Sequence, residues 1–121
     1  MTPAQLRARL ATLLSGLLGL YTRPNGSTTP ALWVGDPPSD YKVSGLEVIV
    51  EPLAGLSLSP VHQGVGIGLE YRVTLIPRSA ANALAAARRI VQALDATEPR
   101  LVPANERLGV LQQYVLTIRS Q

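Results

Sequence analysis

The sequence contains no cysteine and a single histidine, His62. Without cysteine, disulfide frameworks, thiolate zinc sites and cysteine nucleophiles are excluded, whereas the redox compartment stays undetermined. One histidine cannot build a His-rich metal site or paired-histidine chemistry. We therefore expect neither a metal nor a cofactor.

Charged side chains are also scarce. They make up 16% of the 121 residues, against about 25% in typical soluble domains, while hydrophobic residues make up 46%. We expect some of the surface to be covered by other subunits. The net charge of +3 is small for a dedicated nucleic-acid binder, which shows a denser basic patch. The length fits one domain over residues 1–121.

No apolar run is long enough to span a membrane. The run Leu10–Tyr21, preceded by Arg7 and Arg9, has the length of a signal-peptide core. The preceding Thr2-Pro3-Ala4-Gln5 is instead typical of a helix start with a capping box. Leucines then recur at helical spacing. We predict a helix from Thr2 to Gly19 or Tyr21 and no membrane association.

The sequence pattern predicts strands, loops and one further helix in the rest of the chain. The two turn-rich stretches, expected to be loops, are Thr22–Pro30 and Asp36–Gly45. The apolar or alternating stretches, expected to be strands, are Ala31–Gly35, Leu46–Glu51, Val61–Pro77, Leu101–Val102 and Leu108–Arg119. A helix capped by Ser79 is expected over Ala80–Ala96. This order predicts an α+β fold, a mostly antiparallel sheet of about four strands with two helices packed on one face.

The expected strands and loops indicate which aromatic and acidic residues are buried and which are exposed. Alternation places Trp33, Tyr71 and Tyr114 in the core, whereas Tyr21 and Tyr41 lie at element ends and are interface candidates. Glu47 and Glu51 lie four residues apart on the outer face of one strand, about 13 Å from each other. That separation is too large for a retaining carboxylate pair. We expect a solvated sheet face or an inter-subunit salt bridge.

No motif indicates catalysis. Gly64, Gly66 and Gly68 form G-x-G-x-G, but a strand follows where a dinucleotide fingerprint needs a helix. A flexible arm or a close backbone approach explains these glycines better. His62 has no carboxylate or nucleophile nearby in the sequence, so it is expected at the surface.

Five arginines on predicted strands and helices leave two interpretations open. They contact acidic partner surfaces or passing DNA, or they serve solubility and local pairing, for example with Glu70 or Asp95. These residues are Arg72, Arg78, Arg88, Arg89 and Arg119.

The order of elements resembles one known family. A long strand ending in proline (GIGLEYRVTLIPRS) leads into an alanine-rich helix (ANALAAARRIVQAL), and the chain closes on the strand YVLTIRS. With the N-terminal leucine-rich helix, this resembles the bacteriophage tail terminator family, the lambda-type minor tail proteins, and more loosely the small tail-completion proteins. The resemblance covers essentially the whole chain and rests on element order and length.

The resemblance implies a non-enzymatic virion protein of the tail or neck, assembled in the host cytoplasm. It implies a homo-hexameric ring that caps the tail tube, ends tube polymerisation and joins the tube to head-completion or neck proteins. Genomic DNA would pass through its channel without sequence-specific binding. The family supplies no residue motif for the interfaces.

The interface candidates therefore come from the residues themselves: Tyr41 and Lys42 in a loop, Gly66 in the glycine-rich arm, and Arg78 at a strand–helix junction. A heterologous interface of this kind has to close by rotation. Three other functions remain open: another head–tail joining or baseplate component, a small-ligand-binding or enzymatic α+β domain, and a nucleic-acid-binding regulator. The ligand-binding domain would need a pocket with convergent polar groups, and the regulator would bind duplex DNA with a steep salt dependence.

Overall fold

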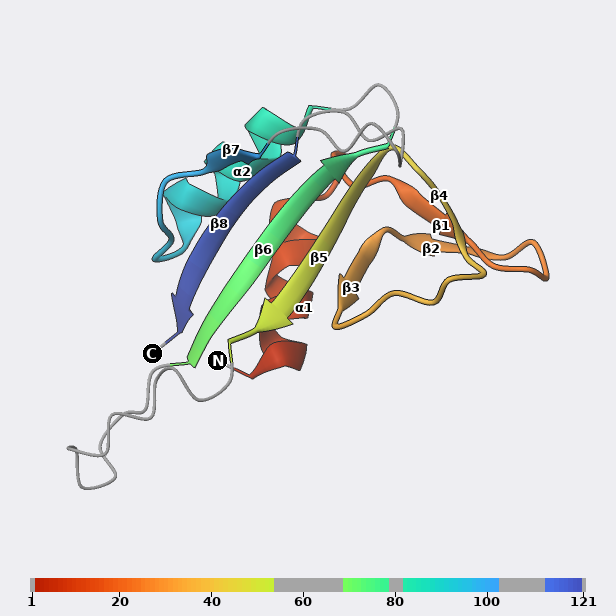
Figure 1. The fold of residues 1–121 in the computed structure, drawn as a ribbon, viewed down its shortest axis with the longest axis horizontal. Coiled ribbons are helices and arrows are strands. Elements are labelled where there is room, and N and C mark those ends of the chain that lie inside the picture. The colour runs from red at the N-terminus through yellow and green to blue at the C-terminus, as the bar shows by residue number, and fades with distance from the viewer. Residues whose placement is uncertain (1, 54–68, 79–81, 103–112, 121) are drawn as a thin grey trace.

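The computed structural model describes residues 2–53, 69–78, 82–102 and 113–120 and contains two helices and two β-sheets (Figure 1). The elements are α1 (Pro3–Leu13), β1 (Leu20–Thr22), β2 (Thr28–Pro30), β3 (Leu32–Val34), β4 (Lys42–Ser44), β5 (Leu46–Pro52), β6 (Leu69–Pro77), α2 (Ala83–Ala93), β7 (Arg100–Val102) and β8 (Gln113–Ser120). The expected α+β class is confirmed. The expected single sheet of about four strands is instead a five-stranded sheet and a separate three-stranded one.

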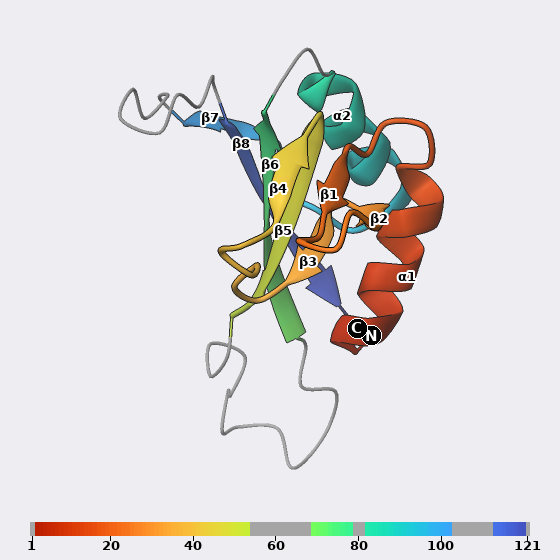
Figure 2. The same cartoon turned by 90° about the vertical axis from the view of Figure 1, so that its right-hand side faces the viewer.

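The five-stranded sheet has the order β3-β5-β6-β8-β7 and is antiparallel except where β3 pairs with β5. Both helices lie side by side on one of its faces, as expected (Figure 2). The alternation of β5, β6 and β8 turns one set of side chains toward the helices. Fully buried core residues from these strands are Leu46, Val48, Val50, Tyr71, Val73, Leu75, Leu116 and Ile118.

Helix α1 begins as its sequence indicates. The Thr2 hydroxyl accepts a hydrogen bond from the Gln5 N–H, and the Gln5 side chain accepts one from the Thr2 N–H. The helix ends at Leu13, well before the predicted Gly19 or Tyr21. The chain turns at Gly16, whose φ of +85° suits glycine, so the apolar spacing continues past the point where the helix stops.

Helix α2 is shorter than the predicted Ala80–Ala96. Its N-cap is Asn82, whose side-chain oxygen accepts from the Ala85 N–H. The predicted cap Ser79 lies outside the described residues. The helix ends at Ala93, because Leu94 adopts an extended backbone and Ala96 already pairs with Ile118 of β8.

The three-stranded sheet, in the order β2-β1-β4, arises from stretches that were expected to be loops. β1 and β2 form a hairpin, and β4 pairs with the other edge of β1. β4 runs into β5 through Gly45, which has a φ of +78°. A Cβ at Gly19 would overlap the carbonyl oxygen of Ser44, so the two sheets meet where glycine backbones touch.

Candidate interface

A buried carboxylate links the two sheets. Glu47 of β5 accepts a hydrogen bond of 2.6 Å from the Tyr21 hydroxyl at its Oε2 atom. Its Oε1 atom accepts from Nε and Nη2 of Arg78 at 2.9 and 2.8 Å. The side chain of Glu47 is only 4% exposed and that of Arg78 is 28% exposed. The expectation that Glu47 is solvated was therefore wrong, because Tyr21 and Arg78 enclose it.

The same contacts perturb the phenol of Tyr21. Burial, the hydrogen bond to Glu47 and the negative charge of Glu47 together raise the pKa of Tyr21 far above its ordinary value of 10.0. The positive charge of Arg78 opposes this effect and is the smallest of the four contributions. Tyr21 therefore stays a neutral donor to a carboxylate throughout the physiological pH range.

Three aromatic rings pack beside this carboxylate. Tyr21, Trp33 and Tyr41 are in mutual edge-to-face contact, with all three centroid separations at 6.0 Å. Tyr21 is 1% exposed, so its expected place at an interface was wrong and it belongs to the interior. Tyr71 is buried as expected, whereas Trp33 and Tyr114 are half-buried.

The structure brings two of the four interface candidates to this cluster. Tyr41 is half-buried against the ring of Tyr21, and Arg78 binds the carboxylate that Tyr21 also binds. Lys42, next to Tyr41, is exposed at the start of β4. Gly66, like His62 and the other glycines of its motif, lies outside the described residues. Their roles in an interface stay predictions.

The arginines on the strands lie beside acidic residues of neighbouring strands. Arg72 lies 3.9 Å from Glu51 across β5 and β6, and both side chains are about half exposed. Arg119 stands opposite Glu70 in the β6–β8 register. The Arg72–Glu51 pair agrees with the local-pairing interpretation, and the register places Glu70 beside Arg119 on the same face.

The face of the five-stranded sheet away from the helices carries no helix in the described part of the chain (Figure 2). Cross-strand partners share a face, so one row of side chains crosses the whole sheet. That row consists of Trp33, Ile49, Thr74, Val115 and Arg100. The first four are half-buried and Arg100 is exposed. We call this surface the open face.

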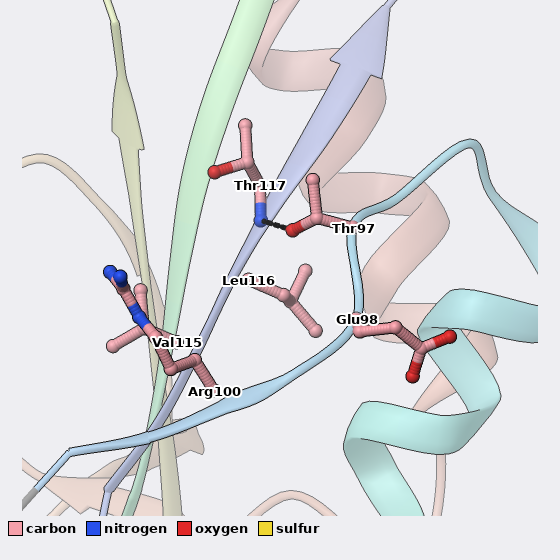
Figure 3. A pocket seen from close by; sticks show the side chains of 6 residues that line it. All are labelled: Thr97, Glu98, Arg100, Val115, Leu116 and Thr117. Atoms are coloured by element: carbon pink, nitrogen blue, oxygen red, sulfur yellow. Dashed lines mark hydrogen bonds between the residues drawn. The ribbon is translucent and has the colours of Figure 1, made fainter.

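A hollow of about 300 Å³ lies beside the β7 edge, and its lining residues are Thr97, Glu98, Arg100, Val115, Leu116 and Thr117 (Figure 3). Beside it, the Thr97 N–H donates to the Thr117 carbonyl oxygen, and the Thr97 hydroxyl accepts from the Thr117 N–H. Glu98 and Pro99 lie between this contact and the Arg100–Val115 pair, outside any strand. The side chains of Glu98 and Arg100 point to opposite sides (Figure 3), so no polar groups converge on a ligand there.

Within the described ranges, no three metal-ligating side chains come together, and every buried side-chain nitrogen or oxygen has a hydrogen-bond partner. Neither α1 nor α2 has the length and apolarity that crossing a bilayer requires. Comparisons of the chain with protein-family models, with curated proteins and with solved structures found no match.

Proposed function

We propose that this chain is a non-enzymatic virion subunit that assembles into a homo-hexameric ring on the end of a phage tail tube. The ring ends tube polymerisation, presents a new surface to head-completion or neck proteins, and leaves a channel for DNA. The element order that resembles the tail terminator family supports this proposal, and so does the α+β fold with both helices on one face of the sheet.

The open face is the observation that carries the proposal. A sheet face about five strands wide, with half-buried Ile49, Thr74 and Val115 at its centre, is a surface on which a second protein can pack. Arg72 and Glu51 lie beside that centre, so the surface combines an apolar middle with a charged periphery. Protein–protein interfaces have this arrangement of core and rim.

The projecting hairpin gives the subunit a second contact region. β1 and β2 extend away from the five-stranded sheet, and their exposed turn spans residues 23–27 (Figure 1). The Tyr21–Glu47 hydrogen bond fixes this hairpin to the main sheet. Two separate surfaces in a fixed relation are what a heterologous interface needs in order to close into a ring.

Tail tube polymerisation tests the proposal. Tube protein from the same source is polymerised with increasing amounts of the chain, and tube lengths and ends are examined by electron microscopy. We expect shorter tubes that stop growing and that carry the chain at one end. Tubes that grow unchanged in excess chain would contradict the proposal.

Substitutions locate the surface that acts. Thr74→Glu introduces a charge at the centre of the open face, and we expect it to reduce capping at least tenfold. Gln92→Glu introduces the same charge on the exposed side of α2 and should cap normally. Arg72→Glu, at an exposed position of the open face, replaces Thr74→Glu if circular dichroism shows that the latter is unfolded. Normal capping by the folded open-face variants would rule out this face as the contact.

A further inference from the structure

The excess of positive over negative charge in the chain lies in its two helices. α1 and α2 contain no acidic residue and carry four exposed arginines, Arg7, Arg9, Arg88 and Arg89. The whole chain has 11 basic and 8 acidic residues. Without these four arginines, the basic residues would number one fewer than the acidic ones. The helix layer therefore accounts for the net positive charge.

Two of these arginines make long hydrogen bonds to the opposite helix. The helices run antiparallel, as Figure 1 shows. Nη2 of Arg9 donates to the carbonyl oxygen of Ala93 at 3.5 Å, where α2 ends. Nη1 of Arg89 donates to the carbonyl oxygens of Leu13 and Ser15 at 3.3 and 3.4 Å, where α1 ends. Each guanidinium thus lies at the negative end of the other helix's dipole.

These contacts leave most of the guanidinium donors available. An arginine has five N–H donors, and these hydrogen bonds use one nitrogen of each side chain. Among the described residues, Arg7 and Arg88 make no hydrogen bond or ion pair. The seam between the helices therefore presents positioned donors, with two further guanidiniums beside it.

The exposed side chains around these arginines are small or polar. Exposed neighbours on the helices are Ala4, Gln5, Ala8, Thr12, Gln92 and Ala93. The helices carry no aromatic residue, and their one large exposed apolar side chain is Leu84, at 38%. A protein partner needs a buried anchor, a membrane needs apolar residues to insert, and a nucleic-acid single strand needs stacking rings. Duplex phosphates need only positioned cations.

We propose that the outer surface of α1 and α2 binds the phosphodiester backbone of duplex nucleic acid without reading its bases. Arg7, Arg9, Arg88 and Arg89 supply the contacts, and arginine suits phosphate because its donors form a planar fork. Binding is weak and strongly dependent on salt. This inference does not require a ring; if the chain does form one, it assigns the helix layer to the side that faces DNA.

Titration of a fluorescent 20-base-pair duplex with the full chain, from 20 to 150 mM salt, tests the proposal. Four phosphate contacts would make log K fall with log salt at a slope of at most about −3.6. Arg7→Ala/Arg88→Ala removes the two arginines that make no hydrogen bond or ion pair within the described residues. We expect it to make the slope shallower by about 1.8 and to weaken binding at 20 mM salt at least tenfold.

Arg72→Ala/Arg100→Ala is the matched control, because it removes the same charge from the open face. We expect it to bind the duplex within twofold of the unmodified chain. Equal weakening by both pairs would show that net charge alone acts and would overturn the assignment. So would no binding at 20 mM salt, or tighter binding to anionic vesicles than to DNA. Duplex binding by a chain that neither assembles nor caps tubes would uphold this inference and overturn the proposed function.

Discussion

At the scale of single residues, the carboxylate of Glu47 has the largest structural consequence. It receives a hydrogen bond from β1 through Tyr21 and two from Arg78, which directly follows β6. A buried charge is tolerated only when its oxygens are paired in this way, and removing a partner leaves the remaining groups desolvated without compensation. The alternation of β5 predicts which face Glu47 occupies. It does not predict burial, because Tyr21 and Arg78 are distant in the sequence.

Glu47→Gln should lower the free energy of unfolding by about 2–3 kcal/mol. It removes the charge that pairs with Arg78, while the partial exposure of Arg78 allows water to compensate in part. Glu51→Gln is the control, since Glu51 and Arg72 form an exposed pair and should contribute at most about 0.5 kcal/mol. Urea denaturation of the two variants measures both values. Equal losses would contradict a special role for Glu47.

The raised pKa of Tyr21 predicts a loss of stability in alkali. Below pH 10 the phenol is neutral in both the folded and the unfolded chain, so its contribution is fully present. Above pH 10 the unfolded chain releases the proton and the folded chain keeps it, which favours unfolding by about 1.4 kcal/mol per pH unit.

In Tyr21→Phe, the free energy of unfolding should fall less steeply between pH 10 and 11.5 than in the unmodified chain. The expected difference is about 1.4 kcal/mol per pH unit. Burial also raises the pKa of Tyr71, so part of the slope should remain in the variant. Denaturant titrations at half-unit pH intervals measure the difference. Identical slopes for the variant and the unmodified chain would show that Tyr21 ionises normally when folded.

At the scale of elements, long periodic segments were predictable and short ones were not. Leu46–Glu51 and the end of the long Val61–Pro77 stretch are strands with the expected core faces, and Thr2 caps α1 as expected. The three strands of the small sheet contain three residues each, too few for a period to show, and glycine, proline and threonine in their connections favour loops.

The junction between the two sheets depends on glycine. Gly19→Ala should destabilise the chain by about 2 kcal/mol or more, because its Cβ would overlap the Ser44 carbonyl and force the backbones apart. Gly16→Ala is the comparison, since no atom lies near a Cβ there and only the positive φ opposes the substitution. Its cost should be about 1 kcal/mol. Thermal unfolding of both variants tests whether Gly19→Ala costs more stability than Gly16→Ala. The opposite result would contradict the close approach of Gly19 to the Ser44 carbonyl.

At the scale of the whole molecule, the two sides of the five-stranded sheet differ in chemistry. The helix side is basic and lacks acidic residues in α1 and α2, whereas the open face mixes apolar and paired charged side chains. Composition alone indicated scarce charge and a small net positive value, but the distribution of that charge required the fold. The two proposals assign a protein partner to the open face and nucleic acid to the helix side.

Native mass spectrometry of the chain, first alone and then mixed with tail tubes from the same source, shows whether the chain assembles into the proposed ring. We expect a six-copy species, formed either in free solution or on capped tube ends. A monomer or dimer that persists in both samples and does not bind to tubes would contradict it.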